Sequence, residues 1–391
     1  MSRQFSMPTV FRMTPVTMIR DFFASLGADT STLDWDTLKQ RDPDPIWDYF
    51  FRLPMDLRQK ADGILRSVFK LACTEGMTAI NDAIEVLHHE PIAVGELKKA
   101  NCYVRALMTW YKDKEVFDRA LTLVQIYKLS WWRKRQHLPR QTPEFTEAVQ
   151  RKFEHELENL FAAKQGRGHV CTVEMFSPGN GMYYFFANPD DYPKSAFSHD
   201  EDRALVTQTF QHTFEIVFAY DSNRGTLEIC GKVSKKVKKQ LETIFIDIVL
   251  NSKIDRYEET VYNLDMMKEF NFTPVIDPED RIRVTLREVE YKTAQGNSIH
   301  FKAAKDVSLM RFTEDILNTE SDFYREAKIT YVKLRFVFLP KGDRPRGSVT
   351  FAISTPNLNT LQNKNPERLE IIKKHLTLWG VEHERVTESH S

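Results

Sequence analysis

The hydrophobic pattern of this chain of 391 residues changes its period at one place, Ala163–Gly168, and that change limits the folds it can adopt. Before it, apolar residues recur at helical spacing, as Phe153 and Leu157 do. After it, apolar and polar residues alternate, as around Phe214 and Ile216, which is typical of strands. The sequence therefore predicts an α+β protein in which an all-helical region precedes an antiparallel α+β region.

The predicted organisation has three parts: an all-helical domain at 1–165, a first hairpin-helix unit at 166–260 and a second at 275–391. Both units read β-β-α-β-β-α, which suggests a tandem duplication; chance is the alternative, because hairpins followed by helices are common. In the first unit the inner helix is expected from the capping box Ser198-His-Asp-Glu201 toward Phe210. In the second it is expected at 306–317.

Composition limits the classes of partner. Basic and acidic residues balance at 55 each, so no global field draws the chain to nucleic acid or a membrane, and such binding needs local patches. The four cysteines form no CxxC pair, and no apolar run is long enough to span a bilayer. We therefore expect a cytoplasmic protein with no membrane partner, no metal and no cofactor.

One catalytic pattern can be written from the residues around the start of the second unit. The residue types of a metal-dependent nuclease of the PD-(D/E)xK type are present in Asp280, Glu290 and Lys292. In such nucleases the carboxylates hold Mg²⁺ and the lysine orients water. The alternative is an ordinary strand with one polar face, which would hold Asp280 and Glu290 about 30 Å apart. We regard these three residues as weak candidates and expect no catalytic residue.

Basic segments give the stronger functional signal. Tyr127–Arg140 has no acidic residue and mixes tryptophan with arginine, the composition that contacts bases and phosphates. A lysine-rich helix and the last hairpin turn add two further patches. The alternative is that these are solvated helix faces and helix C-termini. The predicted nucleic-acid-binding residues are Trp132, Arg133, Lys134, Arg135, Arg140, Lys235, Lys236, Lys239, Arg344 and Arg346.

The function predicted from these features is a non-catalytic nucleic-acid-binding or accessory subunit of a bacterial multiprotein system, phage defence included. Its partners would be DNA or RNA and other protein subunits. The first alternative is a protein-protein scaffold that docks a partner on its aromatic-rich helical domain without nucleic acid. The second alternative is the metal-dependent nuclease.

Overall fold

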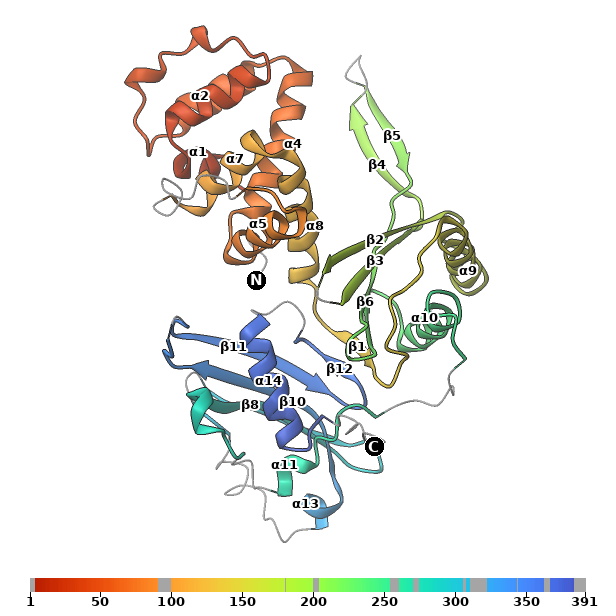
Figure 1. Cartoon of the computed structure of the whole chain (residues 1–391). Helices are drawn as coiled ribbons and strands as arrows, with labels where there is room; N and C mark the ends of the chain where they lie inside the picture. Colours follow the sequence, from red (N-terminus) through yellow and green to blue (C-terminus); the bar gives the residue numbers. More distant parts are fainter. Residues whose placement is uncertain are drawn as a thin grey trace. The chain divides into compact units, whose positions relative to one another are not determined.

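The structure is a computed structural model, and the residues described are 4–90, 100–179, 181–199, 204–253, 260–269, 274–304, 307–309, 322–342, 344–361 and 366–382. The chain forms two compact units, Met1–Lys128 and Leu129–Ser391. Figure 1 shows helices in the first and a large sheet with helices in the second. The predicted α+β class is confirmed.

The first unit is helical throughout its described part. Its elements are α1 (Met7–Met13), α2 (Val16–Ser25), the 3₁₀ turns η1 (Thr30–Thr32) and η2 (Trp35–Thr37), α3 (Asp44–Arg52), α4 (Met55–Leu71), α5 (Thr74–Leu87), α7 (Cys102–Lys112) and α8 (Lys114–Lys128). Aromatic rings build part of its core: the Phe23 ring lies 5.2 Å from that of Tyr49, which lies 5.2 Å from that of Trp35. Such edge-to-face pairs stabilise a core beyond simple burial.

The second unit is built on one ten-stranded sheet in which all pairs are antiparallel, in the order β2-β3-β6-β7-β1-β12-β11-β10-β8-β9. The strands are β1 (Trp132–Arg135), β2 (Cys171–Gly179), β3 (Met182–Pro189), β6 (Ile216–Asp221), β7 (Thr226–Gly231), β8 (Ile282–Lys292), β9 (Ser298–Lys302), β10 (Lys328–Phe338), β11 (Gly347–Ser354) and β12 (Leu358–Asn359). A separate hairpin, β4 (Lys194–His199) and β5 (Leu205–Phe210), extends between β3 and β6.

Helices cover opposite faces of the two halves of this sheet. Helices α9 (Glu147–Gln165) and α10 (Lys235–Ile248) pack on the face of β7 that carries Leu227 and Ile229. Helix α14 (Pro366–Leu378) packs on β10 and β11, as Figure 1 shows. The short helices α11 (Met266–Glu269) and α13 (Asp322–Glu326) and the turn η3 (Pro278–Asp280) complete the second half. Each half therefore has its own hydrophobic core, and the sheet is common to both.

The strand β1 joins the two halves. It pairs with β7 on one side, Arg133 opposite Ile229, and with β12 on the other, Arg133 opposite Leu358. Both β1 and α9 thus belong to the second unit, and Phe153 and Leu157 of α9 lie in its core. For this reason the boundary between the compact units falls at Lys128, before the predicted end of the helical domain at 165.

The tandem duplication is not confirmed, because the two halves differ in strand order. In the first half the second hairpin strand, β3, pairs with β6, whereas in the second half the first hairpin strand, β8, pairs with β10. The helix predicted from Ser198 toward Phe210 is wrong, since β4 and β5 occupy this part of the chain. The helix predicted at 306–317 lies largely outside the described residues.

Across the described residues, every helix is too short or too polar to cross a bilayer.

Candidate nucleic-acid interface

The segment predicted to contact nucleic acid most strongly lies inside the sheet. Trp132, Arg133, Lys134 and Arg135 form β1, and each has at most 6% of its surface exposed. Because β1 has a paired strand on both sides, its side chains project only toward the covered faces. In this structure these four side chains are therefore inaccessible to a nucleic acid.

Buried carboxylates balance the charge of β1, and a buried amide accepts a further hydrogen bond from it. Arg133 donates from Nε to Glu242 Oε2 at 3.1 Å and from Nη1 to Asn357 Oδ1 at 3.2 Å. Lys134 donates to Glu382. Burial by itself would lower the pKa of Lys134, but the carboxylates of Glu382 and Glu228 raise it above its ordinary value, so the ammonium stays charged. The three cations are held as buried ion pairs that connect β1 to the surrounding elements.

The other predicted basic residues are split between surface and interior. Arg140 is exposed and lies beside the β6–β7 turn, within reach of Gly225. Lys235 and Lys236 are exposed, and Lys239 is half-buried, at the start of α10. The two remaining arginines are in the loop between β10 and β11. There Arg344 is buried and Arg346 is exposed.

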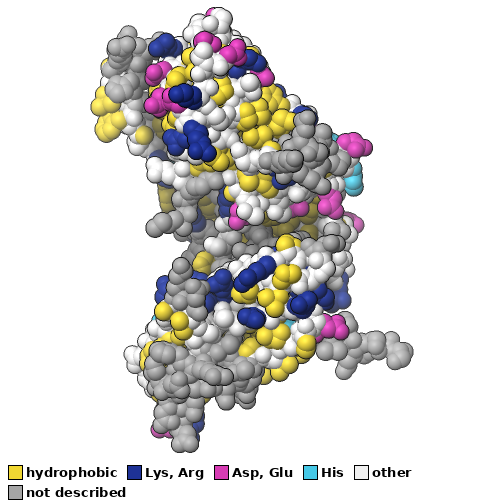
Figure 2. All heavy atoms as spheres, turned by 90° about the vertical axis from the view of Figure 1, so that its left-hand side faces the viewer, with side chains coloured by type: hydrophobic (Ala, Val, Ile, Leu, Met, Phe, Trp, Pro, Cys, Tyr) yellow, Lys and Arg dark blue, Asp and Glu magenta, His cyan; other side chains and the backbone are white. Residues whose placement is uncertain are grey.

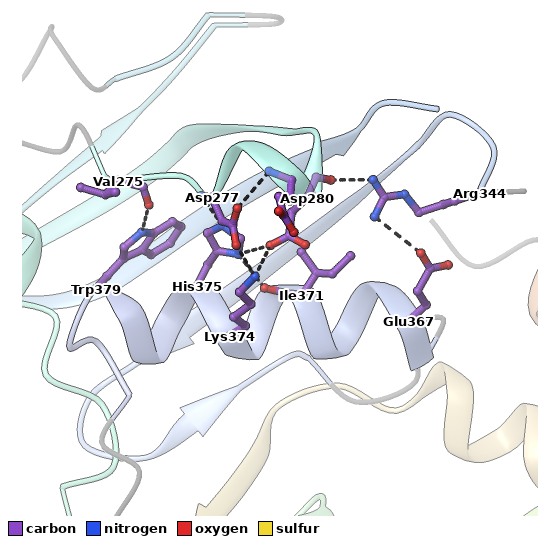
Figure 3. A network of polar contacts seen from close by, with 10 residues as sticks. Val275, Asp277, Asp280, Arg344, Glu367, Ile371, Lys374, His375 and Trp379 are labelled. Atoms are coloured by element: carbon purple, nitrogen blue, oxygen red, sulfur yellow. Dashed lines mark hydrogen bonds and ion pairs between the residues drawn. The ribbon is translucent and has the colours of Figure 1, made fainter. Parts of the chain in front are cut away.

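Asp280 belongs to a polar network at the start of β8, which Figure 3 shows. Lys374 of α14 lies between two carboxylates, with Nζ 2.5 Å from Asp277 Oδ2 and 3.0 Å from Asp280 Oδ2. Hydrogen bonding to these carboxylates raises the pKa of Lys374 to about 12. Beside it, His375 is fully buried: Nε2 accepts from the Asp277 N–H at 3.2 Å and Nδ1 faces the Ile371 carbonyl at 2.8 Å. A carbonyl only accepts, so we assign the proton to Nδ1 and a neutral ring.

The structure does not bring the three nuclease candidates together. Residues 282–292 form the single strand β8, so Asp280 precedes one end and Glu290 lies near the other, about 30 Å away. Glu290 accepts from Thr330 Oγ1 at 3.1 Å, and Lys292 is exposed. Within the described part of the chain, no group of three or more His, Cys, Asp or Glu side chains is placed to hold a metal ion.

A polar surface is present on the side of the second half-sheet that faces away from α14. The register aligns Ser354, Tyr331, Glu290 and His300 across β11, β10, β8 and β9. The neighbouring core residues of β10, such as Val332, point to the opposite face and pack with α14. This surface, which we call the open face, is the continuation of the sheet side that α10 covers in the first half, because Ser354 is aligned through Leu358 with Arg133.

Three aromatic rings lie in a row on the open face. The Tyr331 ring centroid is 5.6 Å from that of His300 and 6.2 Å from that of Trp131, and the planes are inclined by 33° and 35°. Trp131 is 39% exposed, and the side chain of His300 is 41% exposed. Trp131 also has a left-handed backbone, with φ of 67°, a conformation that is uncommon for a large side chain. The outer rings, Trp131 and His300, are therefore exposed to solvent, and Tyr331 between them is half-buried.

Cations outnumber carboxylates on the open face. Among the described residues, the register and strand alternation place six cationic side chains on it: Arg283, Lys292, Lys302, Lys328, Lys333 and Arg335. The two carboxylates are Glu288 and Glu290. Burial would raise the pKa of Glu288, but the charge and hydrogen bond of Lys333, with the Tyr331 hydroxyl and Lys302, hold it below its ordinary value. Glu288 is thus an anion that fixes Lys333, Nζ at 3.3 Å, next to Tyr331.

The lysine-rich start of α10 borders this surface. Lys238 Nζ donates to the Trp131 carbonyl at 3.1 Å, which places the first turns of α10 beside the row of rings. Lys235 precedes Lys238 by three residues and so lies on the same side of the helix. Figure 2 shows one face of the molecule, and its lower part belongs to the second unit. On this face of the second unit, Lys and Arg side chains are more frequent than Asp and Glu side chains. One of the predicted basic patches therefore adjoins the open face.

Sequence reasoning named Glu290 and Lys292 of the open face only as nuclease candidates and missed its aromatic rings and the cations of β10, although a signal for them exists. Tyr331, Lys333 and Arg335 alternate with apolar residues along a predicted strand, which is the pattern of a strand with one polar face. An aromatic residue followed by two cations at spacing two indicates a surface suited to bases and phosphates. The proximity of Trp131 and His300 could not be found in this way, because it depends on the strand order.

No protein-family model matches the chain, and a comparison with curated proteins finds no significant relative.

Proposed function

We propose that this protein binds nucleic acid through the open face of its second half-sheet and the adjoining lysines of α10. The observation that supports this most is the row Trp131, Tyr331 and His300 on a surface where the described residues include six cations and two carboxylates. Aromatic rings stack on bases, and lysine and arginine pair with phosphates. On the open face, aromatic rings for stacking and cations for phosphate pairing lie side by side.

The exposed, flat arrangement of the rings favours single-stranded nucleic acid. In a duplex the bases are paired and stacked, so rings on a sheet surface cannot reach their faces. A single strand can turn its bases onto Trp131, Tyr331 and His300 while its phosphates follow Lys333 and the α10 lysines. Stacking is tolerant of base identity, so we expect little sequence preference.

The test is fluorescence anisotropy with a labelled single-stranded oligonucleotide of mixed sequence, as DNA and as RNA, against the matching duplex. Tyr331→Ala removes one stacking platform and should weaken binding by roughly 5- to 100-fold. Tyr331→Phe keeps the ring and should bind like the wild type. Tyr192→Ala, which removes a 50% exposed tyrosine elsewhere in the second unit, is the matched control.

Charge variants test the second contribution. Lys333→Ala should weaken binding and lower the slope of log affinity against log salt by about 1. The double change Lys235→Glu and Lys236→Glu should also weaken binding. Arg151→Glu, which reverses an exposed charge on α9, should leave binding unchanged. Glu288→Gln removes an anion from the open face and should increase affinity. Binding that is insensitive to salt, or that persists in the Tyr331→Ala and Lys333→Ala proteins, would contradict the proposal.

The accessory role in a bacterial multiprotein system stays a prediction and is compatible with this proposal. We do not extend the proposal to cleavage, because the length of β8 separates Asp280 from Glu290 and Lys292.

A further inference from the structure

The first unit carries an open groove of about 850 Å³ between α1, α3 and α4. Its wall is aromatic: the Trp47 ring lies 4.7 Å from that of Phe51 and 6.0 Å from that of Phe50. Phe51 is 50% exposed and Met55 is 60% exposed. Large apolar side chains that adjoin in one groove and stay this exposed are typical of an interaction site.

Two arginines border the groove, and they differ in their partners. Arg66 lies over the Phe5 ring, with its guanidinium carbon 4.4 Å from the centroid, and pairs with Asp62 at 2.5 Å. Arg58 lies 5.9 Å from the Phe51 centroid and donates to Met55 Sδ at 2.9 Å. Among the described residues no carboxylate forms an ion pair with Arg58. One positive charge at the edge of the groove is thus available for an anion.

The lining also indicates the kind of ligand. Tryptophan, phenylalanine, methionine and arginine are the residue types enriched at protein-protein interfaces, and methionine allows adaptation to different apolar partners. A small ligand would normally be enclosed on most sides, whereas Phe51 and Met55 stay open to solvent. A polypeptide segment therefore fits this groove better than a small molecule.

We propose that the groove binds an acidic amphipathic helix of a partner protein. The apolar face of that helix would lie on Trp47, Phe51 and Met55, and an Asp or Glu next to it would pair with Arg58. Residues Met55 to Arg66 of α4 extend about 16 Å at ~1.5 Å per residue, which matches roughly three helical turns. Apolar anchors at spacing i, i+3 or i+4, and i+7 would occupy this length.

Two copies are not expected to pair groove to groove, because Arg58 calls for an acidic ligand and the described lining of the groove holds two arginines and one aspartate. It lies in the first unit, whereas the proposed nucleic-acid surface lies in the second, so either can fail while the other holds.

The test starts with a phage-displayed library of random peptides selected on the full-length protein. We expect the enriched peptides to share apolar residues at helical spacing with at least one Asp or Glu between them. A synthetic peptide of the consensus sequence is then titrated by fluorescence anisotropy. Phe51→Ala and Arg58→Glu should each weaken its binding at least about tenfold.

Matched controls separate the groove from general effects. Phe197→Ala removes a 76% exposed phenylalanine from β4, and Arg151→Glu reverses an exposed charge on α9, and both should bind the peptide normally. A peptide whose acidic residues are replaced by lysine should lose binding to the wild type and regain it with Arg58→Glu. No enrichment, peptides without acidic residues, binding unaffected by Arg58→Glu, or self-association of the protein that Phe51→Ala abolishes would each overturn the proposal.

Discussion

The guanidinium Nε of Arg133, on the central strand β1, lies 3.1 Å from the carboxylate of Glu242 on α10, and both side chains are more than nine-tenths buried. Arg135 Nε lies 3.7 Å from the other oxygen of the same carboxylate. Glu242 thus contacts two buried cations at the point where the two half-sheets join. The basic segment Trp132–Arg135 is therefore a buried strand whose ion pairs connect the sheet to α10.

Removing Glu242 should therefore be costly. Glu242→Ala removes a buried carboxylate that Arg133 and Arg135 share, and breaking such a pair costs about 3–5 kcal/mol of unfolding free energy. Urea-induced unfolding followed by circular dichroism measures this. Glu147→Ala breaks the exposed pair with Arg151 and should cost at most about 1 kcal/mol. Equal losses in the two variants would contradict the structural role of the Arg133–Glu242 pair.

The β6–β7 turn offers a second prediction, on Gly225. Its φ is +62°, and an added Cβ would lie 2.2 Å from the carbonyl oxygen of Leu138. Gly225→Ala should thus lose about 1 kcal/mol from backbone strain and about 1–3 kcal/mol from the clash. Gly296 also has a positive φ, +92°, but open space around it. Thermal unfolding should therefore show a clearly lower Tm for Gly225→Ala than for Gly296→Ala, and similar Tm values would rule out the clash.

The third prediction concerns pH and Glu288. Burial would raise its pKa, but Lys333, the Tyr331 hydroxyl and Lys302 lower the pKa of the folded state below the ordinary 4.5. A depressed carboxyl pKa stabilises the folded state fully above the unfolded pKa, and this stabilisation disappears as the pH falls through the folded pKa. The wild type should thus be more stable than Glu288→Gln near neutral pH, and the difference should shrink below about pH 4.5. Urea unfolding from about pH 7 to about pH 3 measures it, and a constant difference would contradict the shift.

Periodicity predicted the main elements because local pattern and tertiary packing agree there. The stripe through Phe153 and Leu157 packs on the sheet as expected for an amphipathic helix. The strand β1 could not be predicted, because Trp132–Arg135 is short and has no alternation of apolar and polar residues. Carboxylates supplied by α10 and by Glu382, far away in sequence, pair with the buried Arg-Lys-Arg strand, and a local pattern does not contain them.

The hairpin of β4 and β5 shows a conflict between two local signals. Ser198 and Glu201 match a helix N-terminus, but Leu205–Phe210 contains the β-branched residues Val206, Thr207 and Thr209, which favour a strand. In the structure Leu205–Phe210 is a strand that pairs with β4. Phe197 of β4 is 76% exposed. A capping motif alone is thus weak evidence when the following residues have strand propensity.

For the candidate site, composition located basic segments but not their exposure. Whether a lysine or arginine faces solvent depends on the strand order and on carboxylates from other elements, neither of which a local pattern contains. The exposure of Lys235 and Lys236 at the start of α10 could be predicted, because helical spacing separates them from the apolar positions. Tyr331 and His300 come together only because β8 lies between β9 and β10.

The last hairpin loop provides a direct test of this distinction, because Arg344 and Arg346 are two residues apart and have opposite environments. Arg344 is 6% exposed: Nη2 donates to the Asp280 carbonyl at 2.5 Å, Nη1 lies 3.6 Å from Glu367, and the guanidinium carbon lies 5.3 Å from the Phe338 centroid (Figure 3). Arg346 is exposed. Arg344→Ala should therefore remove one connection between the start of β8 and α14, while Lys374 keeps its contacts with Asp277 and Asp280.

We expect Arg344→Ala to lower the unfolding free energy by about 2–3 kcal/mol, since it leaves a buried carbonyl without its charged donor and removes packing on Phe338. Arg346→Ala should stay within about 0.5 kcal/mol of the wild type. Hydrogen exchange of the β8 amides should accelerate in Arg344→Ala alone, because the loss is local to the junction of β8 and α14. Equal stability of the two variants would show that the environment of Arg344 does not determine its contribution. If Arg344→Ala is destabilised while its affinity for single-stranded nucleic acid is unchanged, this arginine acts through the fold and not through a phosphate contact.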